Sequence, residues 1–556
     1  MKNRYIDLMD KALDAYTYEH ILSYFDKVKN GGFNEHGFAR LTANMGIMIA
    51  HGRRADYIPI FTKMMDFCCA NMPTVKAAND FTVKEIIFCI MALEEKGIFE
   101  KSKIDAWKSG LATIEVPKCY SQFAKTPQDK VYNWACFTML SEFMREYIGI
   151  ADTKEFVDIQ IPTQLQWLDE NGMYRDPNNP MVYDLVPRGL FSVLLNFGYK
   201  GKYFSEIDEA LRKSGLLTLK MQSVTGEIAF GGRSNQFPHN EAHLLIVFEY
   251  EAKRYAREGN MALASAFKRA SEKALDNVDL WLSQYPIRHV KNYFDTATKY
   301  GCENYAYFDK YMITTASFLY AAYLICDESI PSAETEDETP YLLQLSKHFH
   351  KIFAKNGDYF IEIDTCADHH YDASGLGRVH KKGAPSTVCM SVPCTSTPNY
   401  TIDIPDAIDL SLCAGVIEEG EPVFATGAST KYDVVSLDEK NTEITLKNTF
   451  ENGREVVSKY ALSAGGVDIT VSGEGEVAYM IPAFEFDGRT QTEIKSEVNK
   501  LEVIYKGWKC EYTSSAPIIS LNKKGGNRNG HYKAYYTACA DKLNLKIEII
   551  KVENDV

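Results

Sequence analysis

The sequence predicts a multidomain protein in which an α/α toroid, a double ring of helices, is followed by an antiparallel β-sandwich. From residue 1 to about 326, apolar side chains recur at helical spacing, whereas from about 357 they alternate with a period of two. The acidic, proline-containing segment 327–341, DESIPSAETEDETPY, separates the two patterns. We therefore expect a catalytic toroid over 1–326, a linker and helix over 327–356, and a β-sandwich over 357–556.

The first half contains about a dozen segments with helical periodicity. In 131–149, for example, Val131, Trp134 and Phe143 fall close to one stripe, and 309–325 is apolar on several faces, as a buried helix requires. We expect helices over 6–29, 38–51, 55–71, 80–96, 131–149, 185–197, 205–214, 241–257, 261–284, 309–325 and 341–354. Successive antiparallel helix pairs with short connections commonly close into a double ring.

The second half consists of short alternating segments bounded by Gly, Asn, Asp or Ser. Examples are GDYFIEI, TEITLKNTF, REVVSKYALS, VDITVSG, EVAYMIPAF, LEVIYKG, PIISLN and LNLKIEIIKV. Many short strands at even spacing are typical of a β-sandwich. The longer connections of the helical half, at 115–130, 169–184, 223–239 and 286–308, are the expected place for function, because a rigid scaffold presents its loops.

Composition excludes some classes of protein. The formal net charge of −14 argues against a nucleic-acid partner, which requires a basic face. No run of 18 apolar residues is present, so we expect no membrane span, and the charged N-terminus MKNRYIDLMDKALDAYTYEH does not resemble a secretory signal. The 13 cysteines have no CxxC spacing, which favours reduced thiols and a cytoplasmic location.

The densest group of chemically active side chains is 231–243, GGRSNQFPHNEAH. Pro238 suits the first turn of a helix whose free amides form an anion site, and Arg233 adds a clamp for a carboxylate. His239 and His243, four residues apart, share one helix face. The candidate binding residues of this segment are Arg233, Asn235, Gln236, Glu241 and His243. The alternative is an ordinary helix start with a histidine in the core.

A second group lies in 286–311, PIRHVKNYFDTATKYGCENYAYFDKY. It contains Asn304, Tyr305 and Tyr307, together with Tyr311, as candidate sugar-binding or proton-transfer groups. Aromatic filling between helices is the alternative for any single tyrosine. Weaker candidates are the Tyr132–Trp134 segment and the polar residues of 169–188, among them Tyr183 and Arg188.

The third group is 364–383, DTCADHHYDASGLGRVHKKG. Its Asp and His side chains at 364–372 are types that a divalent metal accepts, but their spacing matches no zinc pattern, so we expect no metal. Arg378 and His380, with the lysines at 381 and 382, form a basic loop in an acidic chain. We expect this loop to reach the mouth of the toroid, a solvated turn being the alternative.

A helical toroid followed by a β-sandwich resembles the heparinase and alginate-lyase group of polysaccharide lyases. The strings GGRSNQFPHNEAH, ENYAYFDKY and GLGRVHKKGAPS are similar to the rhamnose–glucuronate lyases. The resemblance implies β-elimination on an anionic oligosaccharide with a glucuronate end. An intracellular enzyme meets short imported oligosaccharides, so we expect exo action. No flavin, nicotinamide or phosphate motif is present, so we expect no cofactor. The resemblance does not determine the oligomeric state.

The chemistry of β-elimination agrees with these residues. The enzyme must offset the uronate carboxylate, for which Arg233 and Asn235 are suited, and supply a base and an acid. The candidates for proton transfer are His239, Tyr305, Tyr307 and His380. A glycoside hydrolase is the main alternative, because Glu241, Asp184 and Asp309 could provide the two carboxyl groups that it requires. A glycan-binding protein without activity is the second alternative.

Overall fold

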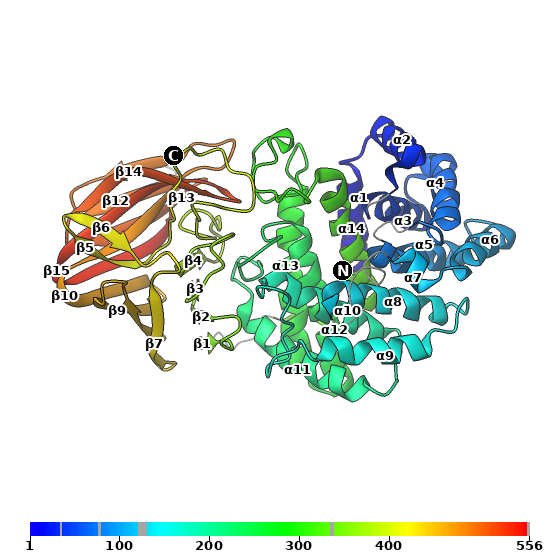
Figure 1. Cartoon of the computed structure of the whole chain (residues 1–556), viewed down its shortest axis with the longest axis horizontal. Helices are drawn as coiled ribbons and strands as arrows, with labels where there is room; N and C mark the ends of the chain where they lie inside the picture. The colour runs from blue at the N-terminus through cyan, green and yellow to red at the C-terminus, as the bar shows by residue number, and fades with distance from the viewer. Residues whose placement is uncertain (34–35, 76–78, 121–129, 334–338, 553–556) are drawn as a thin grey trace.

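The computed structural model describes residues 1–33, 36–75, 79–120, 130–333 and 339–552. A helical domain, a small sheet and a large sheet follow one another along the longest axis of the molecule (Figure 1). The helices all precede residue 326 and the strands all follow residue 340 within these ranges. The predicted fold class, helices followed by antiparallel sheets, is therefore confirmed.

Six helices form a closed inner ring. They are α3 (Gly37–Ala50), α5 (Val83–Glu95), α8 (Asn133–Tyr147), α10 (Met181–Asn196), α12 (His239–Arg257) and α14 (Phe308–Ile325). Each packs against the next in this order, and α14 packs against α3. All side chains of α3 are buried, and most of those of α14 are, because these helices have neighbours on every side.

The remaining helices surround this ring or cap it. They are α1 (Lys2–Leu13), α2 (Tyr18–Lys27), α4 (Ile58–Asn71), α6 (Lys101–Ala112), α7 (Val116–Cys119), α9 (Lys154–Leu165), α11 (Phe204–Met221) and α13 (Met261–Leu282). Helix α1 packs on α14 and α3, and α13 on α12, each through one apolar face. Burying that face against the inner ring is what stabilises an amphipathic helix of this kind.

The β part contains two antiparallel sheets that share one apolar core. The small sheet has the order β1 (Tyr341–Gln344), β2 (Lys351–Asn356), β3 (Tyr359–Asp364) and β4 (Gly375–Lys381), and lies between the helices and the large sheet (Figure 1). The large sheet is built around β10 (Gly466–Phe486) and β15 (Gly530–Lys551), which pair along almost their whole length.

The other strands extend the large sheet on both sides of this pair. They are β5 (Ala414–Glu418), β6 (Glu421–Phe424), β7 (Lys431–Asp438), β8 (Glu443–Thr449), β9 (Glu455–Ser463), β11 (Glu493–Ser496), β12 (Lys500–Tyr505), β13 (Trp508–Ser514) and β14 (Ile518–Asn527). The main path runs β11-β12-β13-β15-β10-β9-β8-β7. Alternation of buried and exposed side chains, as in β9, agrees with the period of two in the sequence.

Several predicted elements differ from the structure. The helix expected over 341–354 is wrong: β1 and β2 form a hairpin there, with Leu342 opposite Ala354. The hairpin forms because β2 also pairs with β3, a non-local contact that outweighs local preference. The helix expected over 6–29 is divided into α1 and α2, and α6, α7 and α9 were not predicted. Helix α9 contains Pro162 and has no apolar stripe.

Two buried contacts join the helical and β domains close to the segment 231–243. The turn between β14 and β15 inserts Arg528, whose guanidinium binds both carboxylate oxygens of Glu303 at 2.6 and 2.9 Å. Next to it, Asn529 Nδ2 donates to Gln236 Oε1 at 3.1 Å. The β domain therefore supports the connections that lead to α12 and α14.

Some expectations concern residues that lie outside the described ranges. These include parts of the predicted connection 115–130 and of the linker 327–341. Within the described ranges, none of the helices combines the length and the apolarity that a membrane crossing requires. All 13 cysteines are free thiols.

Candidate active site

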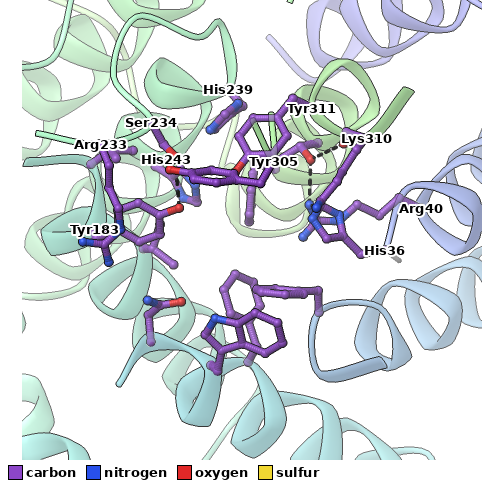
Figure 2. Close-up of a pocket in the computed structure, with 18 residues that line it drawn as sticks. His36, Arg40, Tyr183, Arg233, Ser234, His239, His243, Tyr305, Lys310 and Tyr311 are labelled. Atoms are coloured by element: carbon purple, nitrogen blue, oxygen red, sulfur yellow. Dashed lines mark hydrogen bonds between the residues drawn. The ribbon is translucent and has the colours of Figure 1, made fainter. Parts of the chain in front are cut away.

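The N-terminal ends of the six inner helices converge on one pocket of about 390 Å³ (Figure 2). Its lining residues lie before these helices or in their first two turns, with Phe318 deeper in α14. A helix N-terminus has unpaired amides and the positive end of the helix dipole, equivalent to roughly half an elementary charge. Six such ends make this pocket electrostatically favourable for an anion.

Arg40 of α3 contributes a buried positive charge to the pocket wall. Its Nε donates to both carboxylate oxygens of Glu85 at 3.1 Å, and its Nη1 donates to Thr314 Oγ1 at 2.6 Å. His36 Nδ1 lies 3.1 Å from the same Nη1. Nη2 is buried and makes no hydrogen bond. The guanidinium is thus held rigidly and retains donor capacity for a ligand.

Arg233 provides a second guanidinium in the pocket wall. It pairs with the buried carboxylate of Asp176, and its Nη1 donates to Pro177 O at 2.7 Å. Its Cζ lies 4.3 Å from the ring centre of Tyr183, a cation–π contact. Burial lowers the pKa of Arg233 from its usual value, but a guanidinium stays charged at neutral pH.

Three hydroxyl groups meet at Ser234 (Figure 2). Ser234 Oγ lies 3.1 Å from Tyr183 Oη and 3.1 Å from Tyr305 Oη. Ser234 has a left-handed backbone with φ of 57°, and its amide donates to Glu303 Oε1 at 2.6 Å. Burial raises the pKa of Tyr305, and the neighbouring Tyr183 and Glu303 raise it further. Tyr305 is therefore protonated at neutral pH and has a proton that it can donate, although the raised pKa makes it a weaker acid than a solvated tyrosine.

His239 and His243 occupy one face of α12 toward the pocket. Burial lowers the pKa of His239 well below its usual range, with His243 and Arg40 adding repulsion. It lowers the pKa of His243 to about 3. Both rings are neutral at pH 7, and Nδ1 of His239 is buried without a hydrogen bond. A neutral imidazole has a free nitrogen that can accept a proton, but the lowered pKa makes each of these rings a weaker base than a solvated histidine.

Another part of the pocket wall consists of aromatic rings and an amide side chain. The rings of Phe81 and Trp134 lie 4.3 Å apart, and Phe137 packs on Phe81 at 4.6 Å. Asn133 Nδ2 donates to Asp176 Oδ1 at 2.8 Å, so the carboxylate that holds Arg233 also holds Asn133. Aromatic faces together with polar groups in one pocket are suited to a sugar ring, which has both apolar C–H faces and hydroxyl edges.

None of the described residues that line the pocket is an aspartate or a glutamate. Its charged groups are Arg40, Arg233 and Lys310. The carboxylates of Glu85 and Asp176 lie behind the two arginines and bind them. The lining therefore presents positive charge and neutral proton-transfer groups to a ligand.

The pocket lining contains eight of the residues singled out from the sequence, namely Asn133, Trp134, Tyr183, Arg233, His239, His243, Tyr305 and Tyr311. Three others from the segment 231–243 lie outside its lining. Asn235 Nδ2 donates to Ala229 O at 3.3 Å, Gln236 accepts from Asn529, and Glu241 pairs with Lys291 at 2.6 Å. These side chains hold the connection in place instead of facing the pocket.

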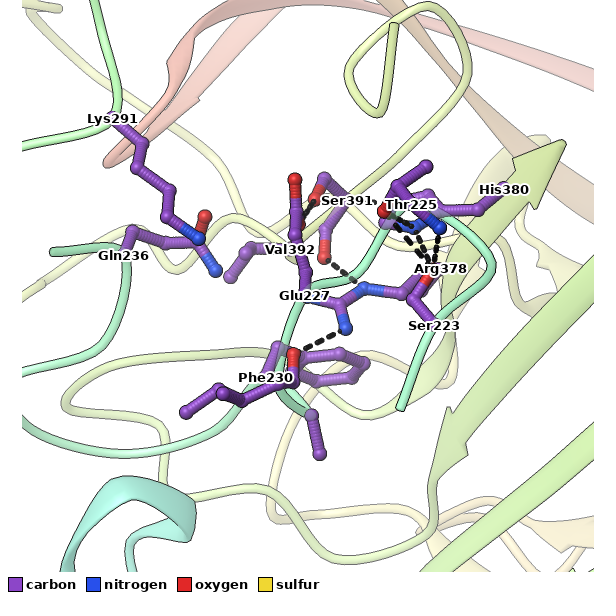
Figure 3. Close-up of polar contacts among 12 residues, drawn as sticks. Ser223, Thr225, Glu227, Phe230, Gln236, Lys291, Arg378, His380, Ser391 and Val392 are labelled. Carbon is purple, nitrogen blue, oxygen red and sulfur yellow. Dashed lines mark hydrogen bonds and ion pairs between the residues drawn. The ribbon is translucent and has the colours of Figure 1, made fainter. Parts of the chain in front are cut away.

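The expected basic loop 378–382 is mostly strand β4, and Arg378 and His380 do not line the pocket. Their side chains are buried against 223–230 of the helical domain (Figure 3). Arg378 Nη1 donates to Ile228 O at 2.6 Å, and His380 Nδ1 lies 2.6 Å from Ser223 Oγ. Residues two apart in a strand share a face, and here that face is the domain contact.

Three further candidates also lie away from the pocket lining. Tyr307 precedes α14 and its side chain is 48% exposed, and Asn304 is exposed in the preceding turn. Arg188 forms a buried ion pair with Asp184 one helical turn earlier. In the segment considered for a metal, Asp364 pairs with Lys351 at 2.9 Å. No cluster of His, Cys, Asp and Glu among the described residues has the geometry to hold a metal ion.

Sequence reasoning missed Arg40, His36 and Ser234. Arg40 lies inside the helix predicted over 38–51, whose other side chains are mostly apolar, and a charged residue in such a helix is a usable signal, because burial of an unpaired charge is costly. Ser234 was within the segment already singled out. No local pattern distinguished His36, which comes close to the other pocket residues only when α3 packs against α14.

Neither a protein-family model nor a curated protein sequence matches the chain. Solved structures do resemble it. A Paenibacillus xanthan lyase superposes with a TM-score of 0.50 at 9% identity, over 100% of this chain and 57% of that one. At this identity the likeness shows the fold alone.

Two other polysaccharide lyases align with lower scores. A chondroitin AC lyase of Streptomyces coelicolor A3 gives a TM-score of 0.49 at 10% identity, covering 100% of this chain and 80% of that one. Heparinase III gives 0.39 at 8% identity, covering 85% and 77%. The superposition on the xanthan lyase shows that the chain has a fold found in a polysaccharide lyase, a helical toroid with a β domain.

Proposed function

We propose that this protein is a carbohydrate lyase that cleaves a uronate-containing oligosaccharide by β-elimination. One observation carries the proposal: six helix N-termini, Arg40, Arg233 and Lys310 surround a pocket whose described lining has no carboxylate. This arrangement favours an anionic sugar. It disfavours a hydrolase of the usual kind, which places two carboxyl groups on either side of the bond.

The carboxylates considered for hydrolysis have other partners. Glu241 pairs with Lys291, Asp184 with Arg188, and Asp309 with His20. A pair of acidic groups facing one sugar is thus missing from the described pocket lining, while neutral histidine and tyrosine side chains are present.

In the proposed reaction, Arg40 Nη2 and Arg233 bind the uronate carboxylate and stabilise the charge that develops when C5 loses its proton. A base takes that proton, and the electron pair forms the C4–C5 double bond. The bond between C4 and the glycosidic oxygen breaks, and an acid protonates the leaving oxygen. No water is consumed, and one product end is a 4,5-unsaturated uronate.

His239 is the proposed base and Tyr305 the proposed acid. The neutral ring of His239 can accept the C5 proton, and the raised pKa of Tyr305 keeps its hydroxyl protonated until the leaving oxygen needs it. Ser234 fixes Tyr305 Oη at 3.1 Å. Tyr307 and His380 are no longer candidates for proton transfer, because neither lines the pocket.

We propose in addition that the enzyme acts at chain ends carrying a glucuronate, as its resemblance to rhamnose–glucuronate lyases implies. The pocket volume of about 390 Å³ lies near the lower end of the range for ligand sites, roughly 300–1,000 Å³, which suits a short glycan end. The apolar side chains of Phe137 and Val186 can cover a sugar without charge beside the uronate.

The test is incubation of the purified chain with glucuronate-terminated oligosaccharides. The ultraviolet absorbance of a conjugated 4,5-unsaturated product is expected. Arg40→Met should raise KM and lower kcat, whereas the control Arg53→Met, at an exposed ion pair outside the pocket, should leave both unchanged. Release of sugar without absorbance, with oxygen from labelled water at the anomeric carbon, would establish the hydrolase instead. Binding without any product would establish a glycan-binding protein.

A further inference from the structure

A second cavity, of about 320 Å³, lies between the helical and β domains. We call it the interdomain cavity. Its wall includes Trp281 from α13, Tyr293 from the connection to α14, and Trp508 and Asn529 from the β domain. None of the residues that line the candidate active site lines this cavity. Both domains are needed to form it.

Aromatic rings make up much of this wall. The ring centres of Trp281 and Tyr293 are 5.4 Å apart, and Tyr505 also contributes. Trp508 is half-buried at the start of β13. Gly383 lies beside its ring: a Cβ atom added to this glycine would come within 3.7 Å of the ring. An aromatic face of this kind packs well against the C–H face of a sugar ring.

Two polar atoms of this wall have no partner. Nε1 of Trp281 and Oδ1 of Asn529 are both buried and make no hydrogen bond, although the two side chains are only 8% and 3% exposed. Almost all buried polar groups are paired in folded proteins, so each exception calls for an explanation. One of these atoms is a donor and the other an acceptor, and a sugar hydroxyl can serve both.

The charges at the cavity are already balanced within the protein. Lys291 pairs with Glu241 at 2.6 Å, and Lys506 Nζ lies 3.5 Å from Asp487 Oδ2 and 4.0 Å from the ring centre of Tyr293. An anion at this wall would compete with Glu241 and Asp487 for the two lysines. The described part of this wall also lacks the arginines and the six helix N-termini that make the candidate active site favourable for an anion.

We propose that the interdomain cavity is a second carbohydrate-binding site, which takes a neutral sugar ring stacked on Trp508 and hydrogen-bonded to Trp281 and Asn529. Its volume lies at the lower end of the range for ligand pockets, roughly 300–1,000 Å³, as a site for one or two rings requires. The proposal does not depend on the reaction at the other pocket. It holds for a lyase, a hydrolase or a binding protein.

The experiment is saturation-transfer NMR of the full chain with D-glucose, D-galactose and D-glucuronate at millimolar concentrations. A neutral hexose should bind the natural chain, and Trp508→Leu should weaken it by roughly tenfold, because the stacking face is lost while apolar volume remains. Tyr147→Leu, which removes a half-exposed ring outside the cavity, is the matched control and should change nothing.

Two further variants separate the sites and guard against misfolding. Arg40→Met should weaken glucuronate binding and leave the neutral hexose unaffected. Leu280→Trp, at a 53% exposed position of the cavity wall, should block the hexose without disturbing the core. Absence of any hexose binding to the natural chain would overturn the proposal. Hexose binding that survives both Trp508→Leu and Leu280→Trp would overturn it equally.

Discussion

Replacement of Arg528 by methionine tests how the β domain supports the candidate site. The guanidinium of Arg528 is 2% exposed, donates to Gly301 O at 2.7 Å and to both oxygens of Glu303, and packs 4.2 Å from the ring centre of Tyr400. Glu303 in turn accepts from the amide of Ser234. Arg528→Met therefore leaves a buried carboxylate with one remaining donor from another segment.

Breaking a buried ion pair by removing one partner costs about 3–5 kcal/mol, chiefly because the other charge stays buried. Arg528→Met and Glu303→Gln should each lower the free energy of unfolding by about this amount. The double variant should lose much less than the sum, since it leaves no unpaired charge. In addition, the amide of Ser234 loses a rigid acceptor, so Tyr305 shifts and kcat should fall by roughly 10²-fold.

Urea unfolding followed by fluorescence, with the four proteins of a double-mutant cycle, measures the coupling. The control is Arg4→Met, which removes an exposed ion pair with Asp276 and should cost below about 1 kcal/mol. Additive losses for Arg528→Met and Glu303→Gln would refute the reasoning. So would a stability loss with unchanged kcat, because Arg528 would then act on the fold alone.

Three other predictions follow from the site and the domain contact. His239→Ala and Tyr305→Phe should each lower kcat by about 10²–10⁴-fold with native far-ultraviolet circular dichroism, and unchanged turnover in either would remove that residue from the mechanism. Arg233→Lys, which keeps the charge beside Asp176 but loses the planar fork, should raise KM for a uronate substrate at least about tenfold, and an unchanged KM would place the carboxylate elsewhere. Burial lowers the pKa of His380 to about 3 from its usual 6.5, so between these values the unfolded chain binds a proton that the folded chain does not. His380 should therefore contribute about 1.4 kcal/mol per pH unit to the loss of unfolding free energy as the pH drops below 6.5, and His380→Gln should reduce the slope in urea titrations by that amount, whereas an identical slope would show that His380 binds protons equally in the folded and unfolded chains.

The fold class could be predicted from the sequence because it follows from local periodicity. A helix and a strand bury their faces with periods of 3.6 and two residues, and the chain changes from one to the other after residue 326. The segment 231–243 could also be identified, because Arg233, His239 and His243 lie together in the sequence. The hairpin at 341–356 could not be predicted from the sequence, since its strands form through pairing with β3.

The composition of the site was decided by the tertiary structure. Arg40 and Tyr305 lie 265 residues apart in the sequence, and only closure of α14 against α3 brings their helices to one pocket. A different contact, of β4 with 223–230, buries Arg378 and His380 away from the pocket. The sequence by itself determined which side chains can bind a carboxylate or move a proton. Whether each one meets a ligand or a neighbouring charge depended on long-range packing, which local patterns do not encode.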